Sequence, residues 1–354
     1  MFYILYLTGV ERYLFQKMIK FGIKVEETVG LDIGSYAIKA VSVKKEGENN
    51  ILTAYNIKKI PFGAKESDTK QLIAETFDEI DLHPEEVNLG FSGPSVIVRF
   101  IDLPKMNKEQ LASALNFEAE KYIPFNVNEV VMDFIMLGDS PEAGKMRVLL
   151  AAAKKDLVES KVRLLEELGM HINILDIDSL AMFNAFMASN PVEETGSAFF
   201  HSGHSQTDML ITVGKEPCFM RQVQIGGRDI YKAISKDMDI PAEKAEELLL
   251  GPEAGDREAV ERAAQSILDD IVREMQLSFG YFENRYGASV SNVYCSGGMM
   301  FQENIVKYLA SKTGFELKTW NPVEGMQLAD HILKEDVDRV ASQLAVSIGL
   351  ALRS

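Results

Sequence analysis

Three glycine-containing turns carry the residues of this sequence that are best suited to binding phosphate. In residues 29–41, apolar residues alternate on both sides of an Asp-x-Gly-Ser core, which predicts a strand, a tight turn and a second strand. Gly34 lets the backbone approach a ligand closely because glycine has no Cβ. Turn N–H groups, the Ser35 hydroxyl and the Lys39 ammonium are predicted to converge on phosphate oxygens.

Similar features recur downstream. A second hairpin of this kind is predicted over residues 198–210, and a third glycine turn follows the β-type run that begins at residue 293. A single turn of this type usually only reverses the chain. Three in this order, at these separations, predict a nucleotide held between two similar halves of the protein.

Composition limits the classes of function. With 354 residues, 46% of them hydrophobic, the chain can bury more than one core. The 37 basic and 53 acidic residues give a net charge of -16, which argues against nucleic acid as a partner. Two cysteines do not make a disulfide framework, and no apolar run approaches the roughly 20 residues that span a bilayer. We therefore expect a cytoplasmic protein without a transmembrane segment.

The elements alternate between helix and strand along the chain. Residues 108–122 have a helical apolar face that stops before Pro124, and residues 130–137 and 146–152 read as strands. For residues 1–25 two interpretations remain: an unstructured extension with Met18 as the true start, which we favour, or a basic amphipathic helix on a membrane surface.

The three turns resemble the phosphate-1, phosphate-2 and adenosine loops of the actin-like ATPases, which occur in this order. Within that superfamily the sequence resembles the PilM family of type IV pilus assembly. The likeness runs from about Met18 onward, and its most specific parts are residues 30–41, 95–99, 117–124 and 344–353. The run Glu-Ala-Glu-Lys-Tyr-Ile-Pro at residues 118–124 is found in PilM proteins but not in the sugar kinases or chaperones of the superfamily.

This resemblance implies an α/β, actin-like fold: two RNase-H-like domains flank a nucleotide cleft, and one of them carries an inserted α/β subdomain, 1C. The expected divisions are a first subdomain of residues 26–105 and 176–195, the insert at 106–175, a second domain at 196–335, and a C-terminal helix at 336–354 that packs back on the first domain.

The resemblance also implies ATP or ADP with Mg²⁺ as ligands. Asp32 matches the aspartate that holds Mg²⁺ through water, which fits the preference of this ion for retaining waters. The implied nucleotide-binding residues are Asp32, Gly34, Ser35, Lys39, Gly203, Thr207, Gly226, Gly227, Glu246, Gly297 and Gly298.

Two positions depart from the family pattern. His201 stands where relatives carry the phosphate-2 aspartate, and Leu249 replaces a lysine that contacts ribose, which leaves Glu246 as the remaining candidate there. Because phosphoryl transfer requires accurate placement of metal and water, we expect nucleotide binding with slow or absent hydrolysis. Asp176 and Asp178 are candidates for orienting a water, although we prefer Asp178 as a helix cap. A zinc site at His201 and His204 is disfavoured because further ligands are missing nearby.

PilM relatives bind the N-terminal cytoplasmic peptide of the inner-membrane protein PilN at the inserted subdomain. The resemblance therefore implies a PilN-like partner, association with the inner membrane through partners, and contacts with other pilus motor components. The candidate groove residues are Leu111, Leu115, Tyr122 and Ile123, and the alternative is that these side chains fill the core of the insert. Two other functions stay open: a sugar or acid kinase of the same superfamily, and a filament-forming protein like FtsA.

Overall fold

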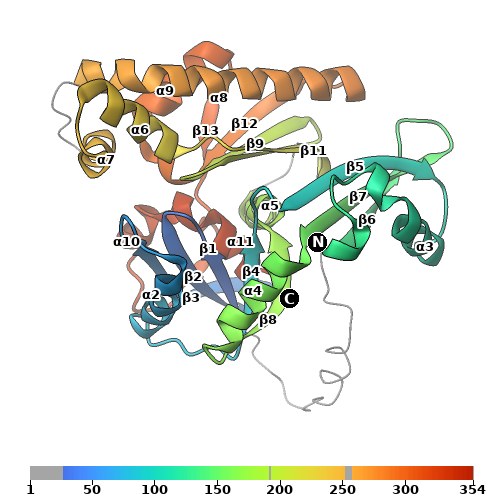
Figure 1. Ribbon diagram of the computed structural model, residues 1–354, viewed down its shortest axis with the longest axis horizontal. Helices are drawn as coiled ribbons and strands as arrows, with labels where there is room; N and C mark the ends of the chain where they lie inside the picture. Colours follow the sequence, from blue (N-terminus) through green and yellow to red (C-terminus); the bar gives the residue numbers. More distant parts are fainter. Residues whose placement is uncertain (1–26, 191–192, 252–256, 354) are drawn as a thin grey trace.

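Two stacked α/β domains and a module at one side make up the structure, a computed structural model that describes residues 27–190, 193–251 and 257–353 (Figure 1). The expectations for residues 1–25 lie outside the described residues. The first sheet, in domain 1, has the strand order β14 (Gln327–Leu328), β3 (Asn49–Lys59), β2 (Ala37–Glu46), β1 (Glu27–Ile33), β4 (Glu86–Phe91) and β8 (His171–Ile177).

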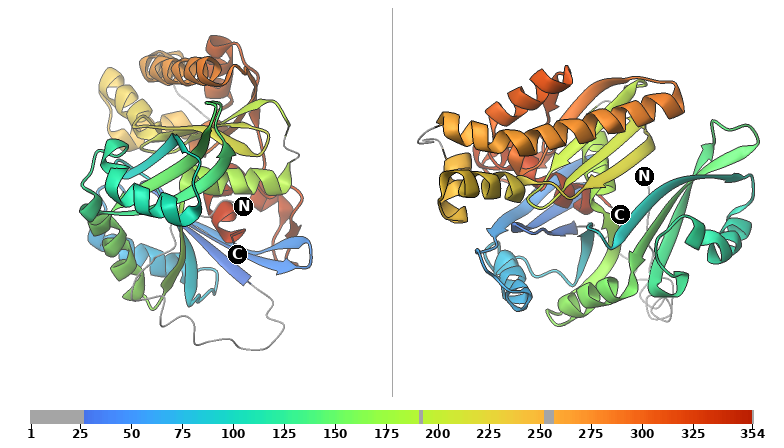
Figure 2. Two further views of the ribbon diagram at one scale, coloured as in Figure 1. Left: turned by 90° about the vertical axis from the view of Figure 1, so that its right-hand side faces the viewer. Right: turned by 45° about the horizontal axis from the view of Figure 1, so that its top comes forward.

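Domain 2 and the side module each contain one further sheet. The sheet of domain 2 has the order β11 (Glu216–Val223), β10 (Thr207–Val213), β9 (Gly196–Ser202), β12 (Val290–Ser296) and β13 (Leu317–Thr319). The side module, here called the insert (residues 96–154), has the order β5 (Val96–Pro104), β7 (Lys145–Lys154) and β6 (Val130–Asp139). The insert extends away from the two stacked domains in the right-hand view of Figure 2.

Helices cover the faces of these sheets. Those of domain 1 are α2 (Glu66–Asp78), α4 (Lys155–Glu166), α5 (Asp178–Ser189), α10 (Lys334–Asp338) and α11 (Ala345–Ala351), with the 3₁₀ turn η4 (Ala341–Leu344). Those of domain 2 are α6 (Gly227–Met238), α7 (Ala242–Leu250), α8 (Arg257–Tyr286) and α9 (Glu303–Thr313), with η3 (Gly298–Phe301). The insert contains α3 (Lys108–Glu118), η1 (Ala119–Lys121) and η2 (Val127–Glu129). No helix of the described ranges is long and apolar enough to cross a bilayer.

The period-2 alternation of the strands divides the apolar residues among separate cores. Leu31 and Ile38 face α2 and α4, whereas Val41 and Val43 lie in a second cluster with α5 and α11. That second cluster also contains Phe199 of β9, so α5 and α11 fill the space between the two large sheets (Figure 1). On its other face, the sheet of domain 2 is covered by α6, α8 and α9.

The boundaries of the insert differ from the predicted 106–175. β5 begins before residue 106 and pairs with β7 over nine positions, so it belongs to the insert. β8 lies inside the predicted range but pairs with β4 in the first sheet. Both differences arise because strand pairing between distant segments, rather than local pattern, decides which sheet a strand joins. The chain also returns to domain 1 before residue 336, because β14 pairs with β3.

The C-terminal segment is not the single helix expected over residues 336–354: α10, η4 and α11 are separate. α11 packs on domain 1 as expected, with almost no space between backbones. A Cβ added to Gly349 would lie 1.7 Å from the carbonyl oxygen of Ala181, and one added to Gly30 would lie 2.0 Å from that of Ser347. Glycine is therefore required at both positions for α11 to contact α5 and β1.

We predict that Gly349→Ala lowers the free energy of unfolding by about 3 kcal/mol or more, because the added methyl group must displace the backbone of α5. The matched control is Gly280→Ala in α8, where an added Cβ meets nothing within 4 Å. That change should stabilise the protein by about 0.5–1 kcal/mol through helix propensity. Chemical denaturation of both variants checks the pair, and similar effects of the two changes would contradict the close packing of α11.

Candidate nucleotide-binding cleft

The first hairpin places a lysine and an aspartate directly against each other. Asp32 and Lys39 are cross-strand partners on β1 and β2, and Lys39 Nζ lies 2.7 Å from Asp32 Oδ2. Both side chains are largely buried. Gly34 forms the turn by donating its N–H to the Ala37 carbonyl, and an added Cβ would come within 2.9 Å of that oxygen. The predicted phosphate-1 hairpin is therefore present, with its two charged groups paired.

The second hairpin packs against the glycine pair that precedes α6. Gly227 N–H donates to the Gly203 carbonyl at 3.0 Å, and Thr207 Oγ1 donates to the Ile225 carbonyl at 2.7 Å. A Cβ on Gly226 would lie 2.5 Å from the His204 carbonyl oxygen. Thr207 and Gly226 thus hold two loops together, rather than lining the cavity themselves.

The third turn contains two glycines with different surroundings. Gly297 has φ 97°, and an added Cβ would lie 2.3 Å from the Ser202 carbonyl oxygen, so close packing and backbone conformation both require glycine there. Gly298 would place its Cβ in open space. Close packing therefore explains the glycine at position 297 but not the one at position 298.

A cavity of about 400 Å³ lies between the domains, within the range of small-ligand sites. Six of the predicted residues line it: Lys39, Gly203, Gly227, Glu246, Gly297 and Gly298. Residues that the sequence reasoning did not select also line it, among them Tyr36, Tyr231, Met299, Arg339 and Gln343. A larger cavity of 620 Å³ lies between α7, α8 and α9, but none of the predicted nucleotide-binding residues lines it.

Side chains of the two domains meet across the cleft at Glu246. Tyr36 Oη donates to Glu246 Oε1 at 2.6 Å, and Lys59 Nζ lies 2.6 Å from the same oxygen. The Glu246 side chain is 5% exposed, so this carboxylate is held by two groups of domain 1. At the phosphate side, Ser35 Oγ donates to Ser205 Oγ at 2.9 Å. The cleft is thus closed at both ends by direct contacts between the two domains.

Histidine 201 is neutral at physiological pH. Burial, assisted by the nearby Lys39 charge, lowers its pKa to about 4, and its Nδ1 lies 2.9 Å from Ser296 Oγ. Burial likewise lowers the pKa of His204 to about 4. A neutral imidazole cannot replace the charge of a carboxylate beside a hydrated cation.

Asp208 was not selected from the sequence, although it lies directly opposite His201 on the paired strands β9 and β10. Its side chain is buried, and burial raises its pKa to about 6. The amides of Gln206 and Gln222 donate to its two oxygens, each at 3.0 Å. Only the pairing register brings this carboxylate to the same face as His201, and the sequence pattern gives no signal for it.

The two aspartates before α5 have other roles than predicted. Asp176 forms a fully buried ion pair with Arg353 at 2.7 Å, so it cannot orient a water in the cleft. Asp178 is the first residue of α5, and no side chain caps this helix, so the prediction of a cap is wrong. Burial and the Asp32 charge raise the pKa of Asp178 well above its usual range. Within the described ranges, no three His, Cys, Asp or Glu side chains are arranged to hold a metal ion.

The residues predicted to line a peptide groove lie mostly in the core of the insert. Leu111, Leu115 and Ile123 are between 0% and 4% exposed and pack against β5, β6 and β7. Tyr122 is half-buried at the edge of the same cluster. The helical stripe therefore faces a core, and these three buried side chains do not offer anchor surfaces to a peptide.

Known proteins resemble this chain in sequence and in fold. The family model described as type IV pilus assembly protein PilM matches residues 30–354. A solved structure described as a PilM-PilN type IV pilus biogenesis complex is similar with a TM-score of 0.84 and 26% identity, over 93% of this chain and 99% of that one. The ethanolamine utilization protein EutJ from Carboxydothermus hydrogenoformans shares the fold with a TM-score of 0.56 and 12% identity, over 94% of this chain and 91% of that one.

The fold is therefore the actin-like arrangement expected from the sequence, with the insert attached to the first domain. The match of the family model extends from the first hairpin to the C-terminus and includes every predicted nucleotide-binding residue. The chain belongs to the PilM family of type IV pilus assembly proteins.

Proposed function

We propose that this protein is a nucleotide-binding scaffold that holds the N-terminal peptide of a PilN-like inner-membrane protein. Its family and its similarity to a solved structure described as a PilM-PilN complex support this proposal. The proposed location is the cytoplasmic side of the inner membrane, where such a peptide would be reached. The carrying observation is that the outer strands of the insert present a row of half-buried apolar side chains on the sheet face opposite α3.

The sheet of the insert distributes its side chains between two faces. On the face covered by α3, Val148 and Leu150 of β7 are fully buried with Leu111. On the opposite face the central strand is also buried, but the outer strands carry half-buried apolar side chains: Val96, Val98, Phe100, Val131, Ile135 and Leu137. An extended or helical peptide could place apolar anchors between these side chains. We therefore propose this face, rather than the α3 stripe, as the peptide site.

We predict that Ile135→Ser weakens binding of a synthetic N-terminal peptide of the PilN-like partner by about tenfold, which corresponds to one lost apolar anchor. The control is Phe117→Ser on α3, which removes an aromatic side chain that is 88% exposed on the other side of the insert. Fluorescence anisotropy of the labelled peptide measures both. Weakening by Phe117→Ser alone would move the site to the α3 side, and no binding by the unmodified protein would exclude the function.

The proposed nucleotide is ADP or ATP in the 400 Å³ cavity. Lys39 would leave Asp32 for the phosphates, and the base would lie on the backbone at Gly298, where a Cβ would find open space. Glu246 would exchange its contacts with Tyr36 and Lys59 for the ribose. The residues fit the nucleotide better than they fit Mg²⁺, because Asp32 is paired with Lys39 and His201 is neutral.

We predict that Gly298→Leu reduces ADP affinity at least tenfold while leaving the free energy of unfolding within about 0.5 kcal/mol, because the new side chain projects into open space. Calorimetric titration with ADP and thermal unfolding measure the two quantities. The control Gly280→Leu adds the same side chain on α8, at a position with nothing within 4 Å and outside the cavity. Unchanged ADP affinity in Gly298→Leu would place the base elsewhere.

We predict that ADP binds the unmodified protein almost equally with and without Mg²⁺, and that His201→Asp makes binding about tenfold tighter with Mg²⁺ than without it. The physical reason is that the new carboxylate adds negative charge beside Asp32, where hydrated Mg²⁺ would lie. His201→Asn is the control for volume without charge. Strong dependence on Mg²⁺ in the unmodified protein would show that a carboxylate at position 201 is unnecessary.

A further inference from the structure

Two side chains of domain 1 bind the carboxylate of α7 that lines the nucleotide cavity. Tyr36 lies in the turn between β1 and β2, and Lys59 is the last residue of β3. Tyr36 Oη donates to Glu246 Oε1 at 2.6 Å, and Lys59 Nζ lies 2.6 Å from the same oxygen. Both contacts therefore join domain 1 to domain 2. We call these three residues the latch.

The latch leaves half of the Glu246 carboxylate without a partner. Both of its contacts go to Oε1, whereas Oε2 is buried and has no hydrogen-bond partner within the described part of the chain. A buried carboxylate oxygen without a donor destabilises the arrangement that contains it. The vicinal hydroxyls of a ribose present two donors side by side, which suits the two oxygens of one carboxylate. Glu246 is therefore better matched to a ribose than to the latch.

Aromatic rings of both domains lie around the latch. Lys59 Nζ lies 5.1 Å from the centre of the Tyr36 ring and 5.7 Å from the centre of the Phe62 ring. Phe62 in turn meets Tyr231 of α6 edge-on at 6.1 Å, and the Tyr36 ring lies 5.3 Å from His204. An ammonium placed over ring faces gains cation–π attraction in addition to its ion pair. Lys59 is thus held in one place although its side chain is 51% exposed.

The latch stands in the way of the ribose contact proposed above. Tyr36 and Glu246 both line the cavity, whereas Lys59 does not. A carboxylate oxygen accepts about two hydrogen bonds, and Oε1 already has two donors. A ribose hydroxyl can therefore bind Oε1 only after Tyr36 Oη or Lys59 Nζ has left it. Lys59 acts on the ligand through Glu246 alone, unlike Lys39, which lines the cavity itself.

We propose that the latch is an autoinhibitory contact, in which Tyr36 and Lys59 compete with the ribose of the nucleotide for Glu246 and lower the affinity of the cleft. This inference rests on the proposed nucleotide-binding function. The contacts of the bound nucleotide must offset the free energy of breaking the latch, so only the surplus appears as affinity. Lys59 thereby determines affinity from outside the cavity. Its effect has the opposite sign to electrostatic attraction, by which a lysine near an anionic ligand strengthens binding.

The test is calorimetric titration of ADP into the unmodified protein and three variants. We expect Lys59→Gln to bind ADP roughly fivefold more tightly, because the ligand no longer breaks an ion pair with Glu246. Tyr36→Phe removes only the hydroxyl and should tighten binding about threefold. Lys59→Arg keeps the charge that pairs with Glu246, so its affinity for ADP should stay within about twofold of the unmodified protein.

A first control tests the loss of positive charge alone. Lys58 precedes Lys59 on β3, but its partners Glu75 and Glu79 belong to domain 1, so its ion pairs do not cross the cleft. Lys58→Gln should therefore leave the affinity for ADP within about twofold of the unmodified protein. Equal tightening by Lys58→Gln and Lys59→Gln would contradict the latch, because the effect would then follow net charge.

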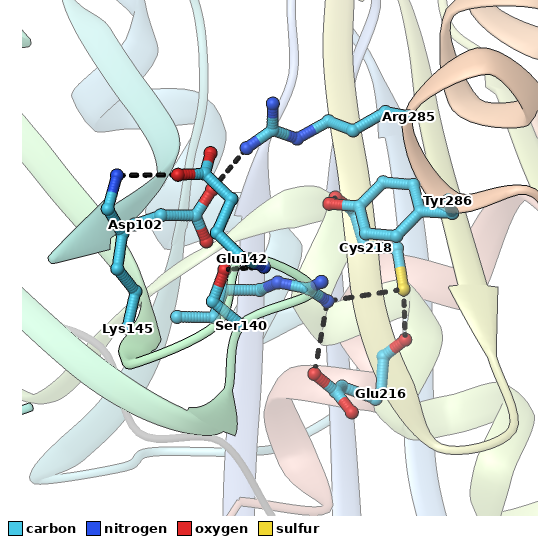
Figure 3. Close-up of polar contacts among 9 residues, drawn as sticks. Asp102, Ser140, Glu142, Lys145, Glu216, Cys218, Arg285 and Tyr286 are labelled. Atoms are coloured by element: carbon cyan, nitrogen blue, oxygen red, sulfur yellow. Dashed lines mark hydrogen bonds and ion pairs between the residues drawn. The ribbon is translucent and has the colours of Figure 1, made fainter.

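A second control tests contacts between the domains in general. Two ion pairs join the insert to domain 2: Asp102 pairs with Arg285, and Arg147 pairs with Glu216 at 3.1 Å (Figure 3). None of these four side chains lines the cavity. Arg285→Gln removes the first pair and should leave the affinity for ADP within about twofold. Tightening in this control would mean that any loosening between the domains has the effect, which overturns a specific role of the latch.

The sign of the change in Lys59→Gln decides between the alternatives. Weaker binding would show that the lysine attracts the nucleotide, and unchanged binding would show that the latch does not compete. Either result overturns the inference and leaves the nucleotide site intact. ADP binding by Lys59→Gln but not by the unmodified protein would support the inference. Absence of ADP binding in both proteins would remove the nucleotide function and the inference together.

Discussion

α11 packs closely between the two large sheets and holds them in one arrangement. Two glycines allow its backbone to touch β1 and α5, and a buried ion pair between Asp176 and Arg353 fixes its end. Burial raises the pKa of Asp176 even beside the arginine, so part of the attraction is spent against lost hydration. Asn88 adds amide hydrogen bonds to the carbonyls of Leu350 and Arg353, both at 2.9 Å. These polar contacts specify one position for the helix.

That position determines the geometry of the cleft. α11 and η4 support the third glycine turn, where Gly297 N–H donates to the Ser342 carbonyl at 3.1 Å. The same region supplies Arg339 and Gln343 to the wall of the cavity. The C-terminal segment therefore links the core of domain 1 to a ligand-binding loop of domain 2. A disturbance at α11 is expected to reach both the stability and the binding site.

Local patterns predicted most elements but not their partners. The alternation around Asp32 and Gly34 identified the first hairpin correctly, because a hairpin is specified by neighbouring residues. The strand β5 was assigned to the wrong unit, since its pairing with β7 joins segments about 50 residues apart. Apolar periodicity at Leu111 and Leu115 indicated a helix face correctly, yet it cannot distinguish a groove from a core.

The candidate site shows the same division. Glycines at tight turns can be recognised from sequence, and Gly203, Gly227, Gly297 and Gly298 all reach the cavity. Asp208 and the ion pair between Arg147 and Glu216 are not predicted, because they depend on strand register and on how two domains pack. Neither feature can be recognised from the order of residues along a single segment.

The chain passes between the two domains twice, once between α5 and β9 and once between β13 and β14. Two bodies tied at two points have one easy motion, a rotation about the line through both ties. A contact far from that line acts with a long lever arm, so a few ångströms at the insert correspond to a much smaller displacement near the axis. The ion pairs between the insert and domain 2 lie far from this axis, so they can stop the whole rotation without any contact near the axis.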